Sequence, residues 1–391
     1  MIALLQEYLQ IKTAHPQPNY HAAVALFKKY ALIDGFLIGE FVLPSKNPVL
    51  ILTYEGTNPL LPSLALNHHM DVVPADNTHE WTHPPFAGTI HENHIIGRGT
   101  QDMKGVGVVH YAALRELKEN NILLERTVHL IMVPDEERGG FYGTKEFIEH
   151  PEFVSLNIGY VLDEGMPSGN DKELLIKIEE RTPIQIKVTS KGLMGHASEL
   201  QHENSAHTLI NFLSDIVSFH REQQALTDDP GTLFSMNITS LSTDNLALNV
   251  IPSQSEATID IRVPSHRSLL QAIELFEVIL KKHPTISHEI IATSVERCTP
   301  TPLDSALYKA CAEAMQIHGI LPKPFAFQAT TDARFYSNKK IETIGMTPFC
   351  VTPNLHGTNE SIRIEDITLG KTIICTFLTI FCKKRELNLT N

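Results

Sequence analysis

Four short apolar runs in the first 165 residues constrain the fold of this chain more than any other feature of the sequence. They are 48–54, 63–67, 127–133 and 158–162. Runs of this length with few polar residues are typical of strands that are buried on both faces of a sheet. Between the second and third runs, residues 105–120 repeat their apolar side chains at helical spacing, which predicts an amphipathic helix packed on the sheet. The sequence therefore predicts an α/β fold.

The middle of the chain has a different pattern. Strict alternation in Thr258-Ile-Asp-Ile-Arg-Val predicts a sheet with one solvent-exposed face. The elements expected in this segment are a strand at 184–190, a helix at 205–221, strands at 235–242 and 256–263, a helix at 267–281 and a strand at 287–295. This βαββαβ order predicts a ferredoxin-like domain. A length of 391 residues also favours two domains. We expect a discontinuous larger domain, 1–181 and 297–391, with residues 182–296 inserted into it.

Composition limits the partners and the compartment. With 32 Lys and Arg against 45 Asp and Glu, the formal net charge is −13, which argues against nucleic acid or an anionic membrane as a partner. No apolar window is long enough to span a bilayer. The five cysteines are odd in number and contain no CxxC pair, so neither a disulfide framework nor a cysteine zinc site is expected. Gln6 and Glu7 interrupt the first apolar run, so we expect no signal peptide and a cytoplasmic protein.

Residues of the types that bind metals follow three of the predicted strands. The clusters are Asn67-His-His-Met-Asp71, Asp135-Glu-Glu137 and Asp163-Glu164, and a fourth, Gly99-Thr-Gln-Asp102, precedes the predicted helix. Loops beyond the carboxyl ends of strands in open α/β sheets converge on one crevice. A single acid before a helix is more often a cap than a ligand, but four clusters together favour a metal site.

Oxygen and imidazole donors without cysteine suit a catalytic zinc site that leaves a position for water. Of the adjacent Glu136 and Glu137, one can bind metal while the other takes a proton from water. Asp71 lies where it can orient His69, since a ligating imidazole needs an acceptor for its second nitrogen. His68 competes with His69, but the spacing to Asp71 favours His69.

Two motif matches are set aside. His79-Glu-Trp-Thr-His83 fits the HExxH string of helical zinc proteases, but Pro84 and Pro85 follow at once and disfavour the required helix. Gly370-Lys-Thr looks like the end of a P-loop, yet Glu365 occupies the place of the first glycine. Nucleotide binding is therefore disfavoured.

Longer motifs carry a resemblance that extends over nearly the whole chain. They are His69-Met-Asp-Val-Val-Pro, 81–86, Gly97-Arg-Gly-Thr-Gln-Asp-Met-Lys, Val133-Pro-Asp-Glu-Glu-Arg-Gly-Gly, Leu162-Asp-Glu-Gly, Gly195-His-Ala-Ser, Asn249-Val-Ile-Pro and Asp260-Ile-Arg-Val. In these stretches the chain resembles the dizinc metallopeptidase family of aminoacylases, carboxypeptidases and acetylornithine or succinyl-diaminopimelate deacylases, and its aminoacylases in particular. The family's dizinc exopeptidase-type catalytic domain is the fold that this resemblance implies.

The resemblance implies two zinc ions per subunit. Asp102 corresponds to the carboxylate that bridges them. His69 and Glu164 correspond to the other ligands of one ion, and Glu137 and His356 to those of the second. Cobalt or manganese would also suit these donors.

The resemblance also implies catalytic roles. Glu136 corresponds to the general base and Asp71 to the residue that orients His69. Segment 182–296 corresponds to the family's lid, which also forms a homodimer. His196 corresponds to a lid histidine that reaches the partner's active site and stabilises the oxyanion.

Three further positions correspond to substrate-binding residues of the family: Asn249, Arg262 and Arg334. A guanidinium can hold the free α-carboxylate of the substrate bidentately. Taken locally, Arg262 alternates with Asp260 on the exposed face of a strand, which indicates a cross-strand ion pair instead.

The string Leu355-His-Gly-Thr-Asn-Glu360 looks more like the carboxypeptidase branch of the family. We expect an enzyme that hydrolyses small N-acyl-L-amino acids to a carboxylate and a free amino acid. One alternative is a metallocarboxypeptidase, a dipeptidase or another N-acyl amino acid deacylase of the same family. The other is a zinc-retaining binding protein without turnover.

Overall fold

The computed structural model describes residues 1–226, 229–245 and 247–383. Contacts within the chain divide it into two compact units. The first contains Met1–Ile178, Thr301–Phe325 and the chain from Thr331, and the second contains Glu179–Pro300 and Ala326–Thr330. The sequence prediction places the boundaries at 181/182 and 296/297, a few residues inside those of the second unit, and does not include its short second segment.

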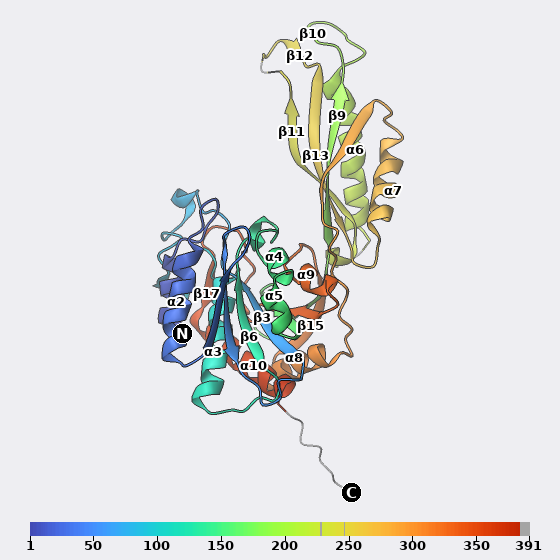
Figure 1. Ribbon diagram of the computed structural model, residues 1–391. Helices are drawn as coiled ribbons and strands as arrows, with labels where there is room; N and C mark the ends of the chain where they lie inside the picture. Colours follow the sequence, from blue (N-terminus) through green and yellow to red (C-terminus); the bar gives the residue numbers. More distant parts are fainter. Residues whose placement is uncertain (227–228, 246, 384–391) are drawn as a thin grey trace. The chain divides into compact units, whose positions relative to one another are not determined.

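A mixed sheet forms the middle layer of the first unit (Figure 1). In spatial order its strands are β1 (Leu37–Val42), β2 (Pro48–Tyr54), β6 (Val128–Val133), β3 (Ser63–His69), β7 (Ile158–Asp163), β16 (Glu342–Gly345), β8 (Glu173–Glu180) and β15 (Leu321–Phe327). β3 pairs in parallel with β6 and β7, and β16 pairs in parallel with β7. The four apolar runs of the sequence are thus β2, β6, β3 and β7, which lie side by side, and the α/β fold class is confirmed.

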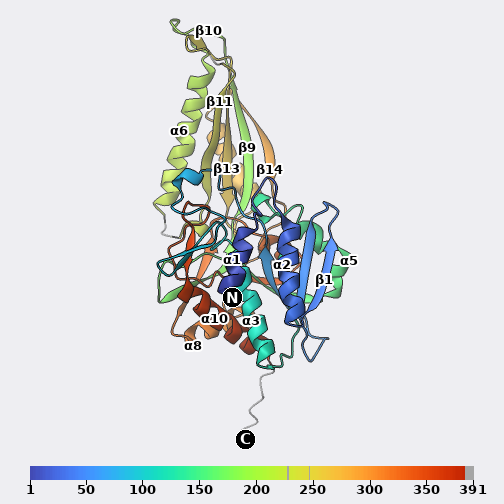
Figure 2. The ribbon, with the colours of Figure 1, turned by 90° about the vertical axis from the view of Figure 1, so that its left-hand side faces the viewer.

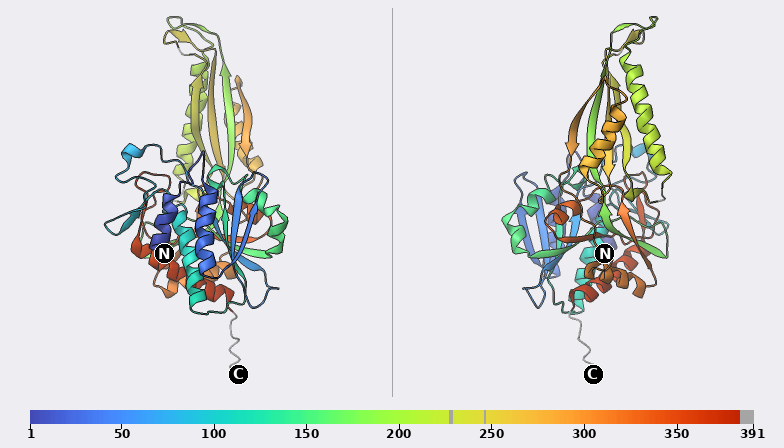
Figure 3. Two further views of the ribbon diagram at one scale, coloured as in Figure 1. Left: turned by 60° about the vertical axis from the view of Figure 1, so that its left-hand side comes forward. Right: turned by 90° about the vertical axis from the view of Figure 1, so that its right-hand side faces the viewer.

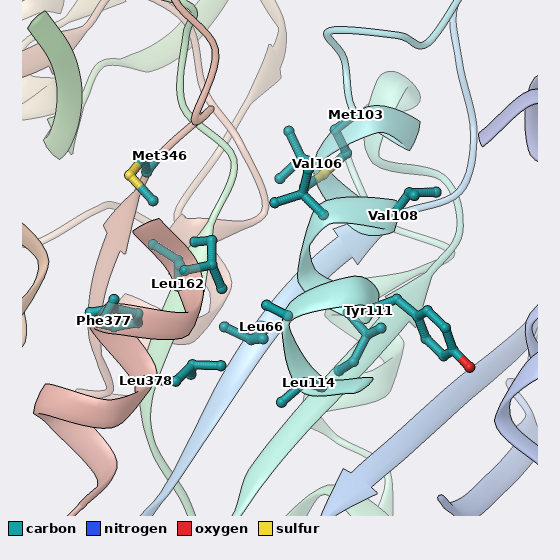
Figure 4. Close-up of a cluster of buried hydrophobic side chains, with 14 of the residues drawn as sticks. Leu66, Met103, Val106, Val108, Tyr111, Leu114, Leu162, Met346, Phe377 and Leu378 are labelled. Atoms are coloured by element: carbon teal, nitrogen blue, oxygen red, sulfur yellow. The ribbon is translucent and has the colours of Figure 1, made fainter. Parts of the chain in front are cut away.

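Helices cover both faces of this sheet. Alternate side chains of its inner strands point to opposite faces, and both sets are apolar, so each face is buried under helices. Leu64 and Leu66 of β3 belong to one core cluster, with α1 (Ile2–Gln10), α2 (Tyr20–Ile33), α3 (Lys104–Glu119), α8 (Ala306–Ile317) and α10 (Ile364–Cys382). Ala65 belongs to another, with α4 (Thr144–Ile148), α5 (Pro151–Ser155) and α9 (Ala333–Asn338). Figure 2 shows α1, α2 and α3 on the first face, and Figure 4 shows Leu114 of α3 beside Leu66.

A small sheet brings two distant parts of the first unit together. It contains β4 (Thr89–His91), β5 (His94–Ile96) and β17 (Ser361–Arg363), and Ser361 pairs with Ile96 in an antiparallel register. The turn that follows β5 and the loop that precedes β17 are therefore attached to neighbouring strands.

The second unit has a βαββαβ order, as the sequence predicts. Its elements are β9 (Thr182–Lys191), α6 (Ser205–Gln224), β11 (Ser235–Thr243), β13 (Gln254–Val263), α7 (Leu269–Leu280) and β14 (Ile286–Thr293), and the spatial order of the antiparallel strands is β11-β13-β9-β14. Two short strands, β10 (Gly195–His196) and β12 (Val250–Ile251), pair separately.

Alternation along β13 explains why the helices of the second unit cover one face of its sheet. Ile259 and Ile261 are buried against α6 and α7 in one core cluster, whereas Thr258 and Arg262 on either side of this pair are only partly buried. Figure 3 shows the open face of this sheet on the left and the face covered by helices on the right.

Across the residues that the structure describes, there is no helix of sufficient length and hydrophobicity to traverse a lipid bilayer.

Candidate metal centre

Three parallel strands deliver ligand-type side chains to the same edge of the sheet. His69 is the last residue of β3, Glu136 and Glu137 form a 3₁₀ turn just after β6, and Glu164 follows β7. The apolar run predicted as this strand covers only residues 63–67. The strand continues through His69 because the main chain still pairs there, opposite Val133 of β6.

The first ligand group contains His69, Asp102 and Glu164, all of which are buried. Nε2 of His69 lies 3.0 Å from Oδ1 of Asp102 and 3.6 Å from Oε2 of Glu164. Asp102 comes from the turn before α3, so this group joins the helix to two strand ends.

The second ligand group contains Asp102, Glu137 and His356. Nε2 of His356 lies 3.2 Å from Oδ2 of Asp102 and 3.1 Å from Oε2 of Glu137. The two oxygens of Asp102 therefore face different groups, as a carboxylate shared by two cations must.

The members of this cluster shift one another's pKa values. Burial by itself lowers the pKa of His69, but the charge of Glu164 and the hydrogen bond to Asp102 raise it well above its ordinary value. Hydrogen bonds to Asp102 and Glu137 raise the pKa of His356 to about 10. Burial and the charge of Asp102 raise the pKa of Glu164 to about 8. Buried carboxylates repel one another, and divalent cations would offset this repulsion. Carboxylate and imidazole groups are also suitable donors for such cations, so the residues fit a dinuclear metal site.

Glu136 lies next to these groups but is a member of neither, as far as the described residues show. Burial, and after it the charge of Glu164, raises the pKa of Glu136 well above its ordinary value. A carboxyl group with a perturbed pKa beside metal ligands is suited to proton transfer.

Asp71 contacts His69 through its main chain. Nδ1 of His69 lies 3.0 Å from the carbonyl oxygen of Asp71, whereas the nearest carboxylate oxygen, Oδ1, is 3.9 Å away. The carboxylate accepts the main-chain N–H groups of Glu136 and Glu137 and pairs with His15. Sequence reasoning did not single out His15, which has no motif around it.

His68 points away from the cluster. Its Nε2 is 2.9 Å from the hydroxyl of Tyr8, and the ring is fully buried between α1 and the sheet. Burial holds the pKa of His68 well below its ordinary value. The structure thus separates the two candidates and turns His69 toward the ligands.

A buried carboxylate holds the turn that carries Asp102. The side chain of Glu360 accepts the main-chain N–H groups of Gly99 at 3.0 Å and Gln101 at 2.7 Å. It also pairs with Nη1 of Arg98 at 2.8 Å. Gly99 has a φ of +95°, a conformation that side chains rarely adopt.

The same arginine holds the loop that carries His356. Nη2 of Arg98 donates to the carbonyl oxygen of His356 and Nη1 to that of Gly357, each at 3.0 Å. Sequence reasoning missed Arg98 and Glu360 as functional residues, although both lie inside motif strings quoted for the resemblance. Their pairing joins positions far apart in the chain, which no local pattern reveals.

Three of the predicted site residues belong to the second unit. His196 is exposed on β10, where it pairs with Val250, and its Nδ1 lies 2.7 Å from the hydroxyl of Ser198. Asn249 is exposed beside β12, and its carbonyl oxygen accepts the N–H of Ala197. Neither residue is a member of the ligand groups described above.

Arg262, the third of these residues, pairs with Asp260 of the same strand, β13, and not across strands as its sequence position indicates. Its Nε lies 2.6 Å from Oδ1 of Asp260, and its Nη1 lies 3.5 Å from the hydroxyl of Thr330.

Arg334 lies in the first unit and is nearly inaccessible. Its Nη1 donates to the carbonyl oxygen of Thr331 at 2.7 Å and its Nη2 to that of Gly139 at 2.5 Å. Its Nε is buried with no hydrogen-bond partner among the described residues. The guanidinium therefore holds the turn after Glu136 in place through one N–H group of each terminal nitrogen.

The two excluded motifs do not form the structures that their chemistry requires. Of 79–83, only His79 and Glu80 belong to a short 3₁₀ turn, and Trp81 is extended. Gly370-Lys-Thr lies within α10 and not in a phosphate-binding loop.

Comparisons with known proteins agree with this geometry. Residues 65–379 match the model of peptidase family M20/M25/M40. The chain is 34% identical to aminoacylase-1 of Mus musculus over 390 residues, which cover 96% of this chain and 94% of that protein. It is 28% identical to succinyl-diaminopimelate desuccinylase of Pelagibacter ubique over 333 residues, with coverages of 84% and 85%. An M20 family metallo-carboxypeptidase from Sulfolobus solfataricus shares the fold, with a TM-score of 0.78 at 18% identity over 97% of this chain and 98% of that one.

Proposed function

Because this chain belongs to peptidase family M20/M25/M40, we propose that it is a metal-dependent amidohydrolase that cleaves N-acyl-L-amino acids into a carboxylate and a free L-amino acid. The observation that carries the proposal is the 34% identity to aminoacylase-1 over 96% of the chain. The two ligand groups that share Asp102 support it, because they supply the donors that such an enzyme needs.

The donors suit two divalent cations, and we expect zinc, with cobalt or manganese also accepted. Asp102 would bridge the cations, His69 and Glu164 would complete one set of ligands, and Glu137 and His356 the other. When bound, the cations supply Lewis-acid activation of the scissile carbonyl and of water.

Glu136 acts as the base in this proposal. Its carboxylate accepts a proton from the attacking water and then delivers that proton to the leaving amide nitrogen. The raised pKa of Glu136 favours holding the proton between these two steps. Cations bound next to it would stabilise its ionised form before each turnover.

Substrate recognition is assigned to Asn249, Arg262 and Arg334. A guanidinium would hold the free α-carboxylate of the substrate. In the structure Arg262 is paired with Asp260, and Arg334 donates to main-chain carbonyls. Each terminal nitrogen of a guanidinium carries two N–H groups, so both arginines keep donors for the substrate's carboxylate beside these partners.

The second unit is proposed to act as a lid and to form a homodimer. His196 from one subunit would then stabilise the oxyanion in the partner's active site, a contribution typically worth about 10²- to 10³-fold in turnover. Its exposed position on β10 leaves the ring accessible for such a contact.

We also propose a cytoplasmic location. The cysteines are free thiols and four of the five are buried. Unpaired cysteines are typical of reducing compartments.

The test is release of free amino acid from N-acetyl-methionine and other N-acyl amino acids, by metal-reconstituted protein and by Glu136→Gln. Loss of the general base should lower kcat by about 10²- to 10⁴-fold. Glu149→Gln is a matched control, because Glu149 is an exposed carboxylate of the same unit and pairs with Lys339. Near-normal turnover by Glu136→Gln with both metals bound would show that the base is wrongly assigned.

A metallocarboxypeptidase or dipeptidase is the second candidate, favoured by the string Leu355–Glu360. Gly-Leu and other dipeptides belong in the same substrate panel for this reason. Preference for dipeptides would assign the chain to that activity, and no turnover of either class would favour a binding protein.

A further inference from the structure

The carboxylate of Asp71 lies beside the metal-binding groups and, within the described residues, belongs to neither. Its Oδ1 accepts the main-chain N–H of Glu136 at 3.2 Å, and its Oδ2 accepts that of Glu137 at 3.0 Å. Oδ2 also lies 2.9 Å from Nε2 of His15. A carboxylate held in this way sets the orientation of the turn that presents Glu136 and Glu137.

The main chain places His15 at this point. The segment between α1 and α2 forms a parallel bridge in which Ala14 pairs with Val72. The N–H of Val72 donates to the carbonyl of Thr13 at 3.1 Å, and the N–H of His15 donates to the carbonyl of Val72 at 3.3 Å. Backbone pairing therefore holds the main chain of His15 next to Asp71, and this pairing does not depend on the side-chain contact.

The contact between His15 and Asp71 is important because the carboxylate is buried. Asp71 is fully buried and the side chain of His15 is 11% exposed. A buried carboxylate is costly unless donors satisfy its oxygens. Replacing His15 by an apolar residue would remove one of those donors. The carboxylate would then turn toward another donor or toward water, and its bonds to the amides of Glu136 and Glu137 would weaken.

We propose that His15 is a positioning residue for the Glu136–Glu137 turn and acts through the carboxylate of Asp71. In this role His15 touches neither substrate nor cation. The inference rests on the proposed function, because it takes Glu136 as the base and Glu137 as a metal ligand.

Two variants separate the hydrogen bond from the bulk of the ring. His15→Leu removes the donor, whereas His15→Gln keeps an N–H that can reach Oδ2 of Asp71. At saturating metal and with N-acetyl-methionine, His15→Leu should lower kcat by about 10- to 100-fold, the usual cost of losing a partner behind a metal site, with KM unchanged. His15→Gln should recover most of that loss.

Amide hydrogen exchange gives a readout that needs neither metal nor turnover. The peptide that contains Glu136 and Glu137 should exchange faster in His15→Leu than in the wild type, and His15→Gln should restore its protection. If the wild-type protein hydrolyses no substrate, the proposed function fails, but this exchange measurement still tests the contact with Asp71.

His129→Leu is the matched control. His129 is also a largely buried histidine with two side-chain contacts, to the hydroxyl of Thr53 at 2.9 Å and the carbonyl of Leu156 at 3.3 Å. It lies near the other end of β6, so its replacement should lower thermal stability and leave both kcat and the exchange of the Glu136–Glu137 peptide unchanged. Wild-type kcat and wild-type exchange in His15→Leu would overturn the proposal, and so would equal losses in His15→Leu and His15→Gln.

Discussion

Asp102 presents its two carboxylate oxygens to two different histidines. Oδ1 faces His69 and Oδ2 faces His356, at 3.0 and 3.2 Å. Burial opposes ionisation of Asp102, but the hydrogen bonds from the two histidines outweigh it and hold the pKa of the carboxyl well below its ordinary value. One side chain thus serves both ligand groups in its ionised form.

Metal content should reveal this sharing. His356→Ala removes a ligand from the second group only, so we expect protein purified in limiting zinc to keep about one ion per chain. Asp102→Ala removes a ligand from both groups, so we expect less than one, because each structural or catalytic zinc site needs at least three protein donors. Elemental analysis after gel filtration measures both values, with Glu149→Gln as the control. Equal metal content in the two variants would contradict a shared carboxylate.

At the scale of elements, two loops are joined by one buried ion pair. Glu360 accepts N–H groups from the turn before α3, and Arg98 donates to carbonyls of the loop that carries His356. Within the described residues neither side chain belongs to a ligand group, yet together they hold the turn that carries Asp102 next to the loop that carries His356.

Breaking this pair from one side should destabilise the protein. Glu360→Gln leaves the Arg98 guanidinium buried without its counter-charge, a change that typically costs about 3–5 kcal/mol. The double variant Arg98→Met, Glu360→Gln should be more stable than Glu360→Gln alone, because it removes the uncompensated charge. Urea unfolding of the apo proteins measures this. If the free energy of unfolding of the double variant falls by the sum of the decreases in the two single variants, the residues act independently.

The sequence predicts those elements whose signal is local. The apolar runs that form β2, β3, β6 and β7, and the periodicity of α3, are read from neighbouring residues, and parallel strand ends then bring His69, Glu137 and Glu164 to one edge. His356 has no such signal, since it lies in a loop with a positive φ of 63°, and only the resemblance identified it.

Other parts of the site depend on pairings that no window of sequence contains. The contacts of Glu360 with Gly99, and of His15 with Asp71, join residues that are far apart in the chain. The same holds for β16, which enters the sheet between β7 and β8. Each is fixed by tertiary structure and not by local propensity.

At the scale of the whole molecule, the proposed homodimer can be tested by mixing subunits. Glu136→Gln and His196→Ala should each be nearly inactive alone. In a hybrid dimer, the subunit that keeps Glu136 would receive an intact His196 from its partner. Random exchange of subunits should therefore restore about a quarter of the wild-type activity, since half of the dimers are hybrids with one complete site.

The recovery is measured as the activity of the mixture after subunit exchange. Light scattering establishes that the protein is a dimer. No recovery from verified hybrid dimers would contradict a role for His196 across the subunit interface, and full activity of a monomer would contradict it as well.

The late position of β16 has a consequence for how the protein is made. The main segment of the second unit, Glu179–Pro300, leaves the ribosome as one continuous stretch that already contains β9, β11, β13 and β14. The sheet of the first unit, by contrast, waits for β16 to fill the place beside β7. At roughly 5–20 residues per second, that wait lasts on the order of tens of seconds. During translation, the inserted unit can thus fold before the unit that surrounds it in the sequence, while the main-chain groups along this edge of β7 have no β16 to pair with.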